Sequence, residues 1–465
     1  MTLGTPGTLD GSAHASQERP FDRHAYLLVL IDCDRPVRGG ARFCLHDATE
    51  VLLGRGTSQR MTRTDDGGLR LALELPSSTL SLTHARLVRE GASWAVEDAR
   101  SRNGTFVNGK RVERSVLASD DIVEVGRTLL AIRHFATVGG SAADADVSDL
   151  AGEPLGLRTF VPALADNFAA LKRIAASTVP LLLLGESGTG KELLSRAVHA
   201  LSGRTGEFVG VNCGALPSGL VEAQLFGHTK GAFSGATRDE LGFLRSADRG
   251  TLLLDEIGEL PRTSQTALLR VLQEGEVVPV GSTRPVRVDT RIVAASNRPL
   301  ASDDPSFRND LYARLAGFTF APPPLRERKE DIGLLVADIL RSRLGEARAA
   351  GVKLAPEVAD SFMRYEWPLN IRELEQALCA AAVLATDGVL RAKHLPAAIT
   401  ARPSRARLPR QVLSEEDTRL RDAVVAAMTE HRGNIAAVAR GMGKAPAQIS
   451  RWLKRFRISP HPFRG

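Results

Sequence analysis

A glycine-rich segment is the first place in this 465-residue sequence where residue types and spacing indicate chemistry. Residues 185–191 fit the pattern Gly-x-x-x-x-Gly-Lys, directly after an apolar stretch at 180–184 and before a helical pattern at 192–199. Glycines let the backbone wrap around phosphate groups at a helix N-terminus, and the lysine would reach the β- and γ-phosphates. The segment therefore predicts a nucleotide-phosphate site made by Gly185, Glu186, Ser187, Gly188, Thr189, Gly190, Lys191 and Glu192.

Two carboxylates follow a second apolar stretch, at residues 251–254. Asp255 would hold Mg²⁺, directly or through water, and Glu256 would polarise the attacking water. An Asp-Glu pair at the end of a strand is often only a solvated turn. About 65 residues after a phosphate-binding loop, the pair instead favours a site that hydrolyses ATP with Mg²⁺.

Alternating strands and helices must position these groups. Apolar strands are expected at residues 180–184, 208–211, 251–254 and 291–295. Continuous apolar strands of this kind are typical of a parallel sheet covered on both faces. We therefore expect an α/β domain over residues 155–325. After three prolines the pattern becomes wholly helical, which predicts a helical lid over residues 326–400.

The rest of the chain predicts a multidomain protein. Residues 25–136 read as short strands separated by turns, which is typical of an all-β sandwich. Residues 1–24 are rich in Gly, Ser, Thr and Pro and are expected to be a disordered tail. Linkers are expected at residues 137–154 and 401–412, and an all-α domain of three helices at 413–465.

The composition excludes several classes of protein. Hydrophobic residues make up 43% and charged residues 25%, as in soluble globular proteins. No apolar run approaches the roughly 20 residues that cross a bilayer, and no signal peptide opens the chain. The four cysteines lack Cys-x-x-Cys spacing, so neither a zinc site nor a disulfide framework is expected. These features predict a cytoplasmic protein without a membrane partner.

The positive charge is concentrated at one end. The last 65 residues carry 14 Lys and Arg against 5 Asp and Glu, whereas the other 400 residues carry 47 against 49. In the last predicted helix, residues 446–457, four large apolar side chains recur at helical spacing: Ile449, Trp452, Leu453 and Phe456. The opposite face carries the candidate DNA contacts Gln448, Arg451, Lys454 and Arg455. Such a helix alone is often just a solvated surface, but the charged tail favours double-stranded DNA.

Residues 155–400 resemble the AAA+ domain of sigma-54-dependent transcriptional activators, the bacterial enhancer-binding proteins. The resemblance lies in a series of motifs in order: GESGTGKE at 185–192, VNCGAL at 211–216, LFGH at 225–228, GAFSGA at 231–236, LDEIGELP at 254–261, FRNDLY at 307–312, PPLRER at 323–328 and WPLNIRELE at 367–375. The C-terminal segment is similar to the Fis-type helix-turn-helix of these activators. The resemblance therefore implies binding to enhancer DNA and to sigma-54 RNA polymerase.

Matching positions imply roles in ATP hydrolysis. Asn212 resembles the residue that restrains Glu256 until ATP is engaged. Asn297 resembles sensor I, and Arg372 resembles sensor II in the lid. Arg308 and Arg314 match arginine fingers that reach the γ-phosphate of a neighbouring subunit, which implies a homo-oligomeric ring, expected to be a hexamer.

The GAFSGA segment resembles the family's GAFTGA loop, which contacts sigma-54. Its residues are Gly231, Ala232, Phe233, Ser234, Gly235 and Ala236. Glycines at both ends favour a mobile loop, and Phe233 is expected to be an exposed apolar anchor. An ordinary glycine-rich surface loop is the alternative interpretation.

The predicted N-terminal sandwich resembles a forkhead-associated (FHA) domain. The resemblance is carried by LGR at 53–55, SLTH at 81–84, RNGT at 102–105 and NG at 108–109. It implies that Arg55 pairs with a phosphothreonine phosphate, Ser81 donates to it and Asn103 holds the peptide backbone, while His84 braces the loops. The partner would be a phosphothreonine protein or a Ser/Thr kinase. A docking sandwich without phosphopeptide binding is the alternative.

Three functions remain open on the sequence. The first is an activator that opens sigma-54 promoter complexes. The second is a DNA-binding repressor on a degraded AAA+ scaffold, which the nearly complete GAFSGA loop disfavours. The third is a phosphothreonine-reading adaptor whose ATPase only assembles it, which the intact set Asp255, Glu256, Arg308 and Arg314 disfavours.

Overall fold

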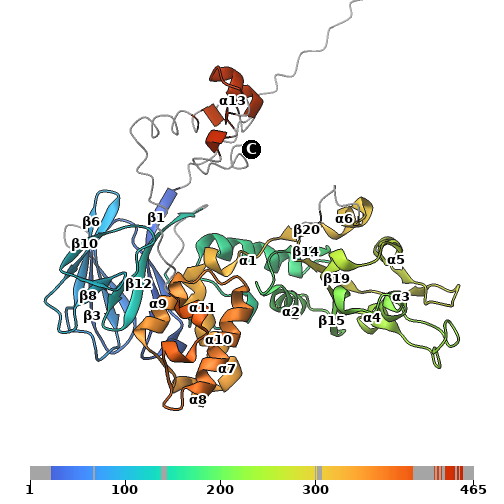
Figure 1. The fold of residues 1–465 in the computed structure, drawn as a ribbon, viewed down its shortest axis with the longest axis horizontal. Coiled ribbons are helices and arrows are strands. Elements are labelled where there is room, and N and C mark those ends of the chain that lie inside the picture. The colour runs from blue at the N-terminus through green and yellow to red at the C-terminus, as the bar shows by residue number, and fades with distance from the viewer. Residues whose placement is uncertain are drawn as a thin grey trace, which may run out of the picture. The chain divides into compact units, whose positions relative to one another are not determined.

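Two β-sheets packed face to face form the first part of the chain in the computed structural model (Figure 1). One has seven strands in the order β13-β2-β1-β12-β11-β8-β9, and the other has six in the order β10-β7-β6-β3-β5-β4. The strands are β1 (Asp22–Asp32), β2 (Ala41–Cys44), β3 (Ala48–Arg55), β4 (Arg60–Asp65), β5 (Leu69–Leu75), β6 (Ala85–Glu90), β7 (Ser93–Asp98), β8 (Thr105–Val107), β9 (Lys110–Val112), β10 (Arg114–Leu117), β11 (Val123–Val125), β12 (Thr128–Thr137) and β13 (Ala145–Asp146).

The structure describes residues 22–65, 69–137, 144–298, 300 and 306–401, and, further on, 424, 427–428, 431, 435–445, 448–449 and 451–453. Residues 1–400 form one unit and residues 401–465 a second. Within the described residues, no helix is long and apolar enough to cross a membrane.

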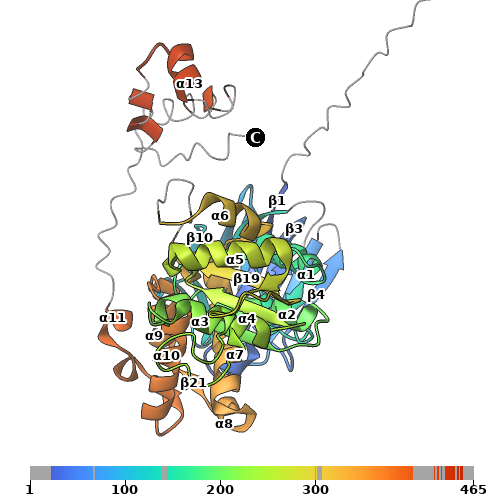
Figure 2. The same ribbon diagram turned by 90° about the vertical axis from the view of Figure 1, so that its right-hand side faces the viewer.

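A five-stranded parallel sheet follows, in the order β15-β16-β19-β14-β20 (Figure 2). Alternate side chains of its strands pack on opposite faces. Leu181, Leu183 and Val293 face one group of helices, whereas Leu182, Leu252 and Ile292 face another. The strands are β14 (Leu181–Leu184), β15 (Phe208–Asn212), β16 (Thr251–Asp255), β19 (Arg291–Ser296) and β20 (Phe318–Phe320). The first face carries α1 (Pro162–Ala175) and α2 (Lys191–Leu201), and the second carries α3 (Val221–Phe226), α4 (Gly242–Ser246), α5 (Arg262–Glu274) and α6 (Asn309–Leu315).

The expected order of strands and helices is therefore present. The ends of the strands also show why residues from separate segments lie close together. All four pairings in this sheet are parallel, so the carboxyl ends of its strands meet at one edge. Asn212 and Asp255 are register partners at that edge. The amide of Gly185 donates to the carbonyl of Ser296 there, at 3.0 Å. Segments far apart in sequence thus converge on one place.

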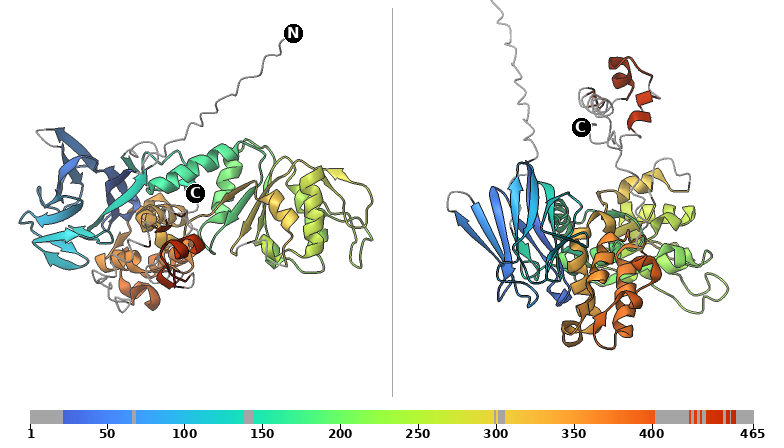
Figure 3. Two further views of the ribbon diagram at one scale, coloured as in Figure 1. Left: turned by 90° about the horizontal axis from the view of Figure 1, so that it is seen from above. Right: turned by 60° about the vertical axis from the view of Figure 1, so that its left-hand side comes forward.

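A helical subdomain completes the first unit. It contains α7 (Ile332–Leu344), α8 (Glu346–Ala350), α9 (Pro356–Arg364), α10 (Asn370–Leu384) and α11 (Ala397–Thr400), with the short strands β21 (Lys353–Leu354) and β22 (Val389–Leu390). Its core is continuous with the β-sandwich, because Leu28, Leu30 and Leu129 belong to the same buried cluster as Leu334 and Phe362. Figure 3 shows the blue sandwich strands beside these orange helices from two directions.

The observed boundaries differ from the expected ones at two places. Strand β1 begins at Asp22, inside the segment expected as a tail over residues 1–24. In the expected linker over 137–154, β13 pairs with β2, and Asp144 accepts bonds from the Cys44 amide and from Arg63. The physical reason is that this segment adds a strand to the sandwich edge, which satisfies backbone groups that a free linker would leave to water.

The second unit has a small apolar cluster of its own. Its buried members are Val424, Met428, Val438, Ala439, Ile449 and Leu453, and Trp452 packs against them. Helix α13 (Ile435–Gly441) supplies Val438. The predicted inward face of the last helix is thus buried at Ile449 and Leu453, while Phe456 lies outside the described residues.

Candidate functional site

The glycine-rich loop connects β14 to α2 and needs its glycines. Gly188 and Gly190 have φ of 76° and 98°, in the left-handed region that glycine favours. A Cβ at Gly188 would lie 2.1 Å from the carbonyl oxygen of Leu369. Helix α2 starts at Lys191, so the loop presents backbone amides at a helix N-terminus, as anion sites require.

Lys191 is buried beneath this loop. Its Nζ donates to the carbonyl oxygens of Gly185 at 2.8 Å and Glu186 at 3.0 Å. Burial lowers the pKa of Lys191, and the nearby Asp255 carboxylate opposes that shift. The ammonium is thus held in position by carbonyls that it can exchange for phosphate oxygens.

The loop opens onto a cavity of about 530 Å³, a size ordinary for a small-molecule site. Its polar lining brings together residues of separate segments: Lys191, Asn212, Asp255, Glu256, Asn297 and Arg372. Its apolar lining includes Leu155, Phe168, Leu335, Ile339 and Ile371. A polar end beside a phosphate-binding loop and an apolar end suited to a base fit a nucleotide.

The carboxylates lie where the strand edge meets the cavity. Asp255 ends β16, and its Oδ1 accepts from the amide of Glu256 at 3.0 Å. Glu256 has φ of 52°, a conformation that costs free energy and is concentrated at functional sites. Because Asp255 shares the cavity with Lys191, its carboxylate fits a Mg²⁺ ion carried by a bound triphosphate.

Asn212 lies beside Glu256. Its Oδ1 accepts from the amides of Gly214 at 2.9 Å and Ala215 at 3.2 Å. A Cβ at Gly214 would lie 2.9 Å from Oε2 of Glu256 and 3.3 Å from Oδ1 of Asn212. Both side chains therefore rest against the same glycine, close enough for the arrangement that the sequence resemblance implies.

Two lid residues to which the sequence assigned no role, Arg326 and Asn370, clamp the loop. Arg326 pairs with Glu186 through Nη1–Oε2 at 2.8 Å and Nη2–Oε1 at 2.6 Å. The buried Asn370 donates to Oε2 of Glu186 at 3.2 Å and to the carbonyl of Ser187 at 2.9 Å. The hydrogen bonds from Arg326 and Asn370 lower the pKa of Glu186 to about 2. Arg372 reaches Oγ of Ser187 at 3.3 Å.

The remaining loop residues have local roles. Oγ1 of Thr189 donates to the carbonyl of Glu186 at 2.9 Å. Glu192 points along α2 and pairs with Arg196 at 2.9 Å. The sequence places Glu186 in the phosphate-binding loop, where its acidic side chain would repel phosphate, but its partner Arg326 is 140 residues away and is identified only by the structure.

The two proposed arginine fingers lie outside the cavity of their own chain. Arg314 is exposed on α6. Arg308 precedes α6 and pairs with Asp310, with Nη2–Oδ2 at 2.6 Å, and also contacts Oγ1 of Thr266 at 3.2 Å. The hydrogen bonds that Arg308 donates to Asp310 raise the pKa of Arg308, so the guanidinium stays charged.

The segment 231–236 forms a closed turn. The amide of Gly231 donates to the carbonyl of Ala236 at 2.8 Å, and the amide of Ala236 donates to Phe233 at 3.0 Å. Phe233, expected to be exposed, is half-buried because its ring packs on His228, with centroids 5.0 Å apart. Ser234 and Gly235 are exposed at the tip.

Three loops of the β-sandwich place the predicted phosphopeptide residues together. The amide of Arg55 donates to the carbonyl of Ser81 at 2.9 Å, and Oγ of Ser81 accepts from the amide of Arg102 at 3.1 Å. That acceptance leaves the Ser81 hydroxyl proton to donate elsewhere. Asn103 donates from Nδ2 to the carbonyl of Thr79 at 2.6 Å, so it braces the loop between β5 and β6.

His84 is buried behind these loops. The Ser81 amide donates to its Nδ1 at 3.2 Å, which leaves Nε2 to donate to the carbonyl of Gly104 at 3.1 Å. Burial lowers the pKa of His84. The neutral ring therefore joins two loops, as a bracing residue would.

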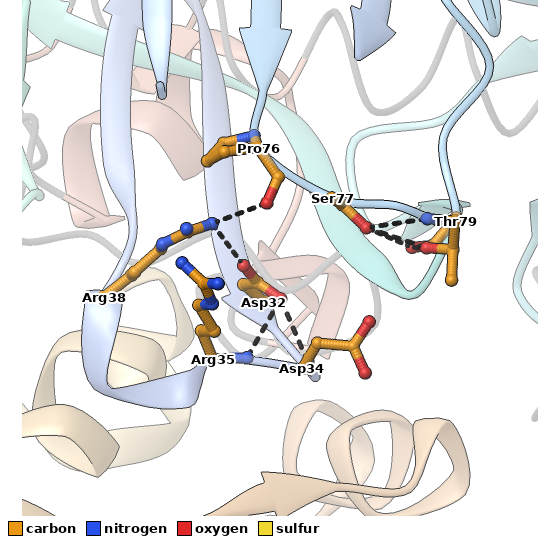
Figure 4. Close-up of polar contacts among 8 residues, drawn as sticks. Asp32, Asp34, Arg35, Arg38, Pro76, Ser77 and Thr79 are labelled. Carbon is orange, nitrogen blue, oxygen red and sulfur yellow. Dashed lines mark hydrogen bonds and ion pairs between the residues drawn. The ribbon is translucent and has the colours of Figure 1, made fainter. Parts of the chain in front are cut away.

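Two groups of hydrogen bonds, joined through the backbone between Pro76 and Ser77, connect the segment at 76–79 with Arg38 and Asp32 (Figure 4). Hydroxyls of Ser77 and Thr79 lie 2.8 Å apart. Nη1 of Arg38 donates to the carbonyl of Pro76 at 3.2 Å and to Oδ2 of Asp32 at 2.9 Å. Arg38 ends the short helix η1 (Pro36–Arg38), which packs on α7.

Two of the four candidate DNA contacts are described. Gln448 is half-buried and Arg451 is exposed, both in helical backbone. Lys454 and Arg455 lie outside the described residues.

Comparisons with known proteins match three parts of the chain. Residues 158–321 match the family model described as "Sigma-54 interaction domain", residues 326–411 match "AAA+ ATPase lid domain" and residues 51–126 match "FHA domain". The predicted FHA and AAA+ folds are thereby confirmed.

Curated relatives extend the match. The chain is 49% identical over 237 residues to the Nif-specific regulatory protein of Rhodobacter capsulatus, covering 50% of this chain and 41% of that protein. It is 39% identical over 304 residues to the transcriptional regulatory protein ZraR of Escherichia coli, covering 64% and 68%. A crystal structure of NtrX from Brucella abortus matches 67% of this chain and 71% of that one, at 29% identity and a TM-score of 0.48. The chain thus spans less than half of the first relative and about two thirds of the second.

Proposed function

The chain belongs to the family of sigma-54-dependent transcriptional activators, and from this premise we propose that it hydrolyses ATP to open promoter complexes of sigma-54 RNA polymerase. The observation that carries the proposal is the cavity, which gathers Lys191, Asp255, Glu256, Asn297 and Arg372 at one sheet edge. A repressor on a degraded scaffold would not need this set. An adaptor that only assembles with ATP would not need Glu256.

The chemistry follows from the positions of these groups. The Mg²⁺ that accompanies ATP supplies charge neutralisation at the β- and γ-phosphate oxygens. Asp255 would hold that ion, and Lys191 would bind the phosphates in place of its two carbonyl partners. Glu256 orients and polarises the attacking water, and Asn212 restrains it. Asn297, which directly follows β19, and Arg372 of the lid report on the γ-phosphate.

The fingers argue for a ring. Arg308 and Arg314 lie outside their own cavity, so they can stabilise the transition state only in the site of another subunit. This supports a homo-oligomeric ring, for which six subunits is our proposal. The turn at 231–236 then contacts sigma-54, with Phe233 released from His228 during the ATPase cycle.

The C-terminal unit supplies the DNA contact. Its positive charge and the exposed Arg451 support binding to phosphates and base edges of double-stranded enhancer DNA. Gln448 and Arg451 lie on the same helix as the buried Ile449 and Leu453, which anchor that helix to the small core. A DNA-bound, ATP-driven regulator of this kind acts in the cytoplasm.

We assign control of the ATPase to phosphothreonine recognition by the FHA domain. The support is a large intramolecular interface. Arg133 of β12 pairs with Glu330 at 3.0 Å, with both side chains mostly buried, and the Leu354 amide donates to the carbonyl of Cys33 at 2.8 Å. The partner would be a phosphothreonine protein, or the Ser/Thr kinase that makes it.

Helix α7 joins the FHA domain to the nucleotide. On one side, a Cβ at Gly333 would lie 1.7 Å from the carbonyl oxygen of Leu30, so the helix is in direct contact with β1. On the other side, Leu335, Ile339 and Ser342 line the nucleotide cavity. A peptide that shifts the loop between β5 and β6 can therefore move α7 through Arg38 and η1. Such a movement would also shift the α7 residues that line the cavity.

Transcription in vitro tests the main proposal. The full chain, sigma-54 RNA polymerase and a supercoiled sigma-54 promoter would be combined with ATP or with a non-hydrolysable analogue. We expect permanganate-reactive, open promoter DNA only with ATP and wild-type protein. Open complexes with the analogue, or none with ATP across a range of protein concentrations and with a phosphothreonine ligand present, would contradict the proposal.

A further inference from the structure

A fully buried amide joins the catalytic segment to a proposed finger. Gln265 lies in the first turn of α5 with 0% exposure. Its Nε2 donates to the carbonyl oxygens of Leu260 at 2.7 Å and Ser306 at 2.9 Å. Its Oε1 accepts from the amide of Arg308 at 2.9 Å. Both donors and the acceptor of one side chain are therefore bonded to backbone groups.

The Leu260 end of this link leads to the catalytic carboxylate. Between Glu256 and Leu260 the chain forms the tight turn η4 (Ile257–Glu259). The amide of Glu259 donates to the carbonyl of Glu256 at 2.9 Å, and the amide of Leu260 donates to Ile257 at 3.1 Å. Glu256, which has a left-handed backbone, and Leu260 are therefore the two ends of one internally bonded turn.

The Arg308 end leads out of the site. Besides its amide bond to Gln265, Arg308 reaches Oγ1 of the next residue, Thr266, at 3.2 Å. Two successive residues of α5 thus hold the backbone and the guanidinium of the finger. Among the described residues, the only other side-chain partner of the Arg308 guanidinium is the nearby Asp310.

We infer that Gln265 is a positioning residue that couples the catalytic segment of one subunit to the finger which that subunit presents to its neighbour. The inference rests on the proposed ATPase ring and deepens it, because it names the residue through which the nucleotide state of one site would affect catalysis in the next. When Glu256 responds to the nucleotide in its own cavity, Leu260 and Gln265 carry the change to Arg308, which acts in the adjacent cavity.

The chemistry of the amide explains why glutamine is suited to this position. A glutamate would place one oxygen in the position of Nε2, where it would repel the carbonyls of Leu260 and Ser306. A methionine has a similar length but would leave one amide and two carbonyls unpaired in a buried place, which is costly. Neither change removes any group that touches nucleotide, since Gln265 does not line the cavity.

Mixed rings separate the finger from the catalytic base. Subunits carrying Glu256→Gln keep their fingers but lack the base, and subunits carrying Arg308→Ala keep the base but lack that finger. Each alone should be nearly inactive, and their mixture should regain ATPase activity because fingers reach neighbouring sites. The test adds Gln265→Met to the Glu256→Gln subunit, with Gln273→Met, an exposed residue of the same helix, as the matched control.

We expect Gln265→Met to reduce the regained activity by about 10²-fold, which is the cost of misplacing an intact group by about an ångström. Gln273→Met should leave it unchanged. The Kd for a fluorescent ATP analogue, and ring formation by sedimentation, should be the same in both variants. Thr266→Val, which removes only the hydrogen bond to the Arg308 guanidinium, should give a smaller loss of the regained ATPase activity. It is the replacement test variant if Gln265→Met does not fold.

The outcomes are distinct. Equal complementation by the Gln265→Met and Gln273→Met subunits, with Thr266→Val also silent, overturns the inference and leaves the ring intact. A loss that is fully explained by weaker ATP binding or by lost assembly also overturns it, because Gln265 would then be only structural. Absence of complementation with unmodified Gln265 overturns the proposed ring and the trans finger themselves.

Discussion

Arg326 of the lid and Glu186 of the phosphate-binding loop form a two-point ion pair, with N–O distances of 2.8 and 2.6 Å. The pair fixes the lid to the loop that would hold the nucleotide phosphates. Its energetic contribution is modest because Arg326 and Glu186 are 34% and 43% exposed, and water screens such pairs to about 1 kcal/mol or less.

The ion pair predicts a pH dependence. The pKa of Glu186 falls from 4.5 to about 2 in the folded chain, so its stabilising contribution is fully present above about pH 5. That contribution is lost as the pH falls through 4.5 toward 2. Thermal unfolding should therefore show a difference between wild type and Glu186→Gln at neutral pH that shrinks below pH 4.5. Glu192→Gln, in the first turn of α2 and paired with Arg196 of the same helix, is the matched control, and an identical pattern in both variants would contradict the prediction.

The ring predicts a concentration dependence of turnover. ATPase activity per subunit should rise with protein concentration, because the fingers act between subunits. Arg308→Ala or Arg314→Ala should lower kcat by about 10³-fold or more, as for other arginine fingers. A steady-state ATPase assay over a dilution series measures both effects. Turnover that is independent of concentration and unaffected in either variant would exclude the ring.

The position of Glu256 predicts a separation of binding from hydrolysis. Glu256→Gln should bind ATP with Mg²⁺ at close to wild-type affinity, because Asp255 and Lys191 are unchanged, yet barely hydrolyse it. Equilibrium binding and single-turnover hydrolysis measure the two steps. If the variant hydrolyses ATP at the wild-type rate, the catalytic base lies elsewhere.

The turn at 231–236 predicts uncoupling of ATPase from transcription. Ser234→Ala or deletion of Phe233 should leave ATPase activity largely intact, because neither residue lines the cavity, and should abolish open complexes. Thr237→Ala, just beyond the turn, is the matched control. Normal open-complex formation by both variants would remove the assigned contact with sigma-54.

The FHA–lid contact predicts reciprocal coupling between two ligands. A phosphothreonine peptide should change the Kd for ATP by about 5- to 150-fold, and ATP should change peptide affinity by the same factor. Arg55→Ala should abolish peptide binding, because the phosphate loses its guanidinium. Isothermal titration of the full chain measures both affinities.

Gly333 provides the control for that coupling. Gly333→Ala would push a methyl group onto the Leu30 carbonyl at 1.7 Å and should loosen the contact between α7 and the sandwich. Peptide binding should persist while its effect on ATP is lost. Gly351→Ala, whose Cβ would lie 3.5 Å from its nearest neighbour, should retain the coupling. Peptide binding without any change in ATP affinity in wild type would mean that the signal enters by another route.

The sequence by itself determined the local parts of this protein. The loop at 185–192, the strand ending at Asp255 and the FHA loops around Arg55 and Ser81 were all expected, because such motifs depend on short stretches of chain. Glycine at 188 and 190 is needed for left-handed backbone, and an apolar strand followed by carboxylates indicates a sheet edge. These requirements concern residues that are neighbours in the sequence, and the motifs that carry the family resemblance are equally short.

Only the tertiary structure decided how these parts are joined. The Glu186–Arg326 pair, the bridge from Gln265 to Arg308 and the contact of Gly333 with Leu30 link residues separated by long stretches of chain. The ordered segment after β12 likewise depends on a long-range contact, the pairing of β13 with β2. The physical reason is that a side chain's residue type fixes which bonds it can make, whereas its partners are chosen by packing of the whole unit, which no local pattern encodes.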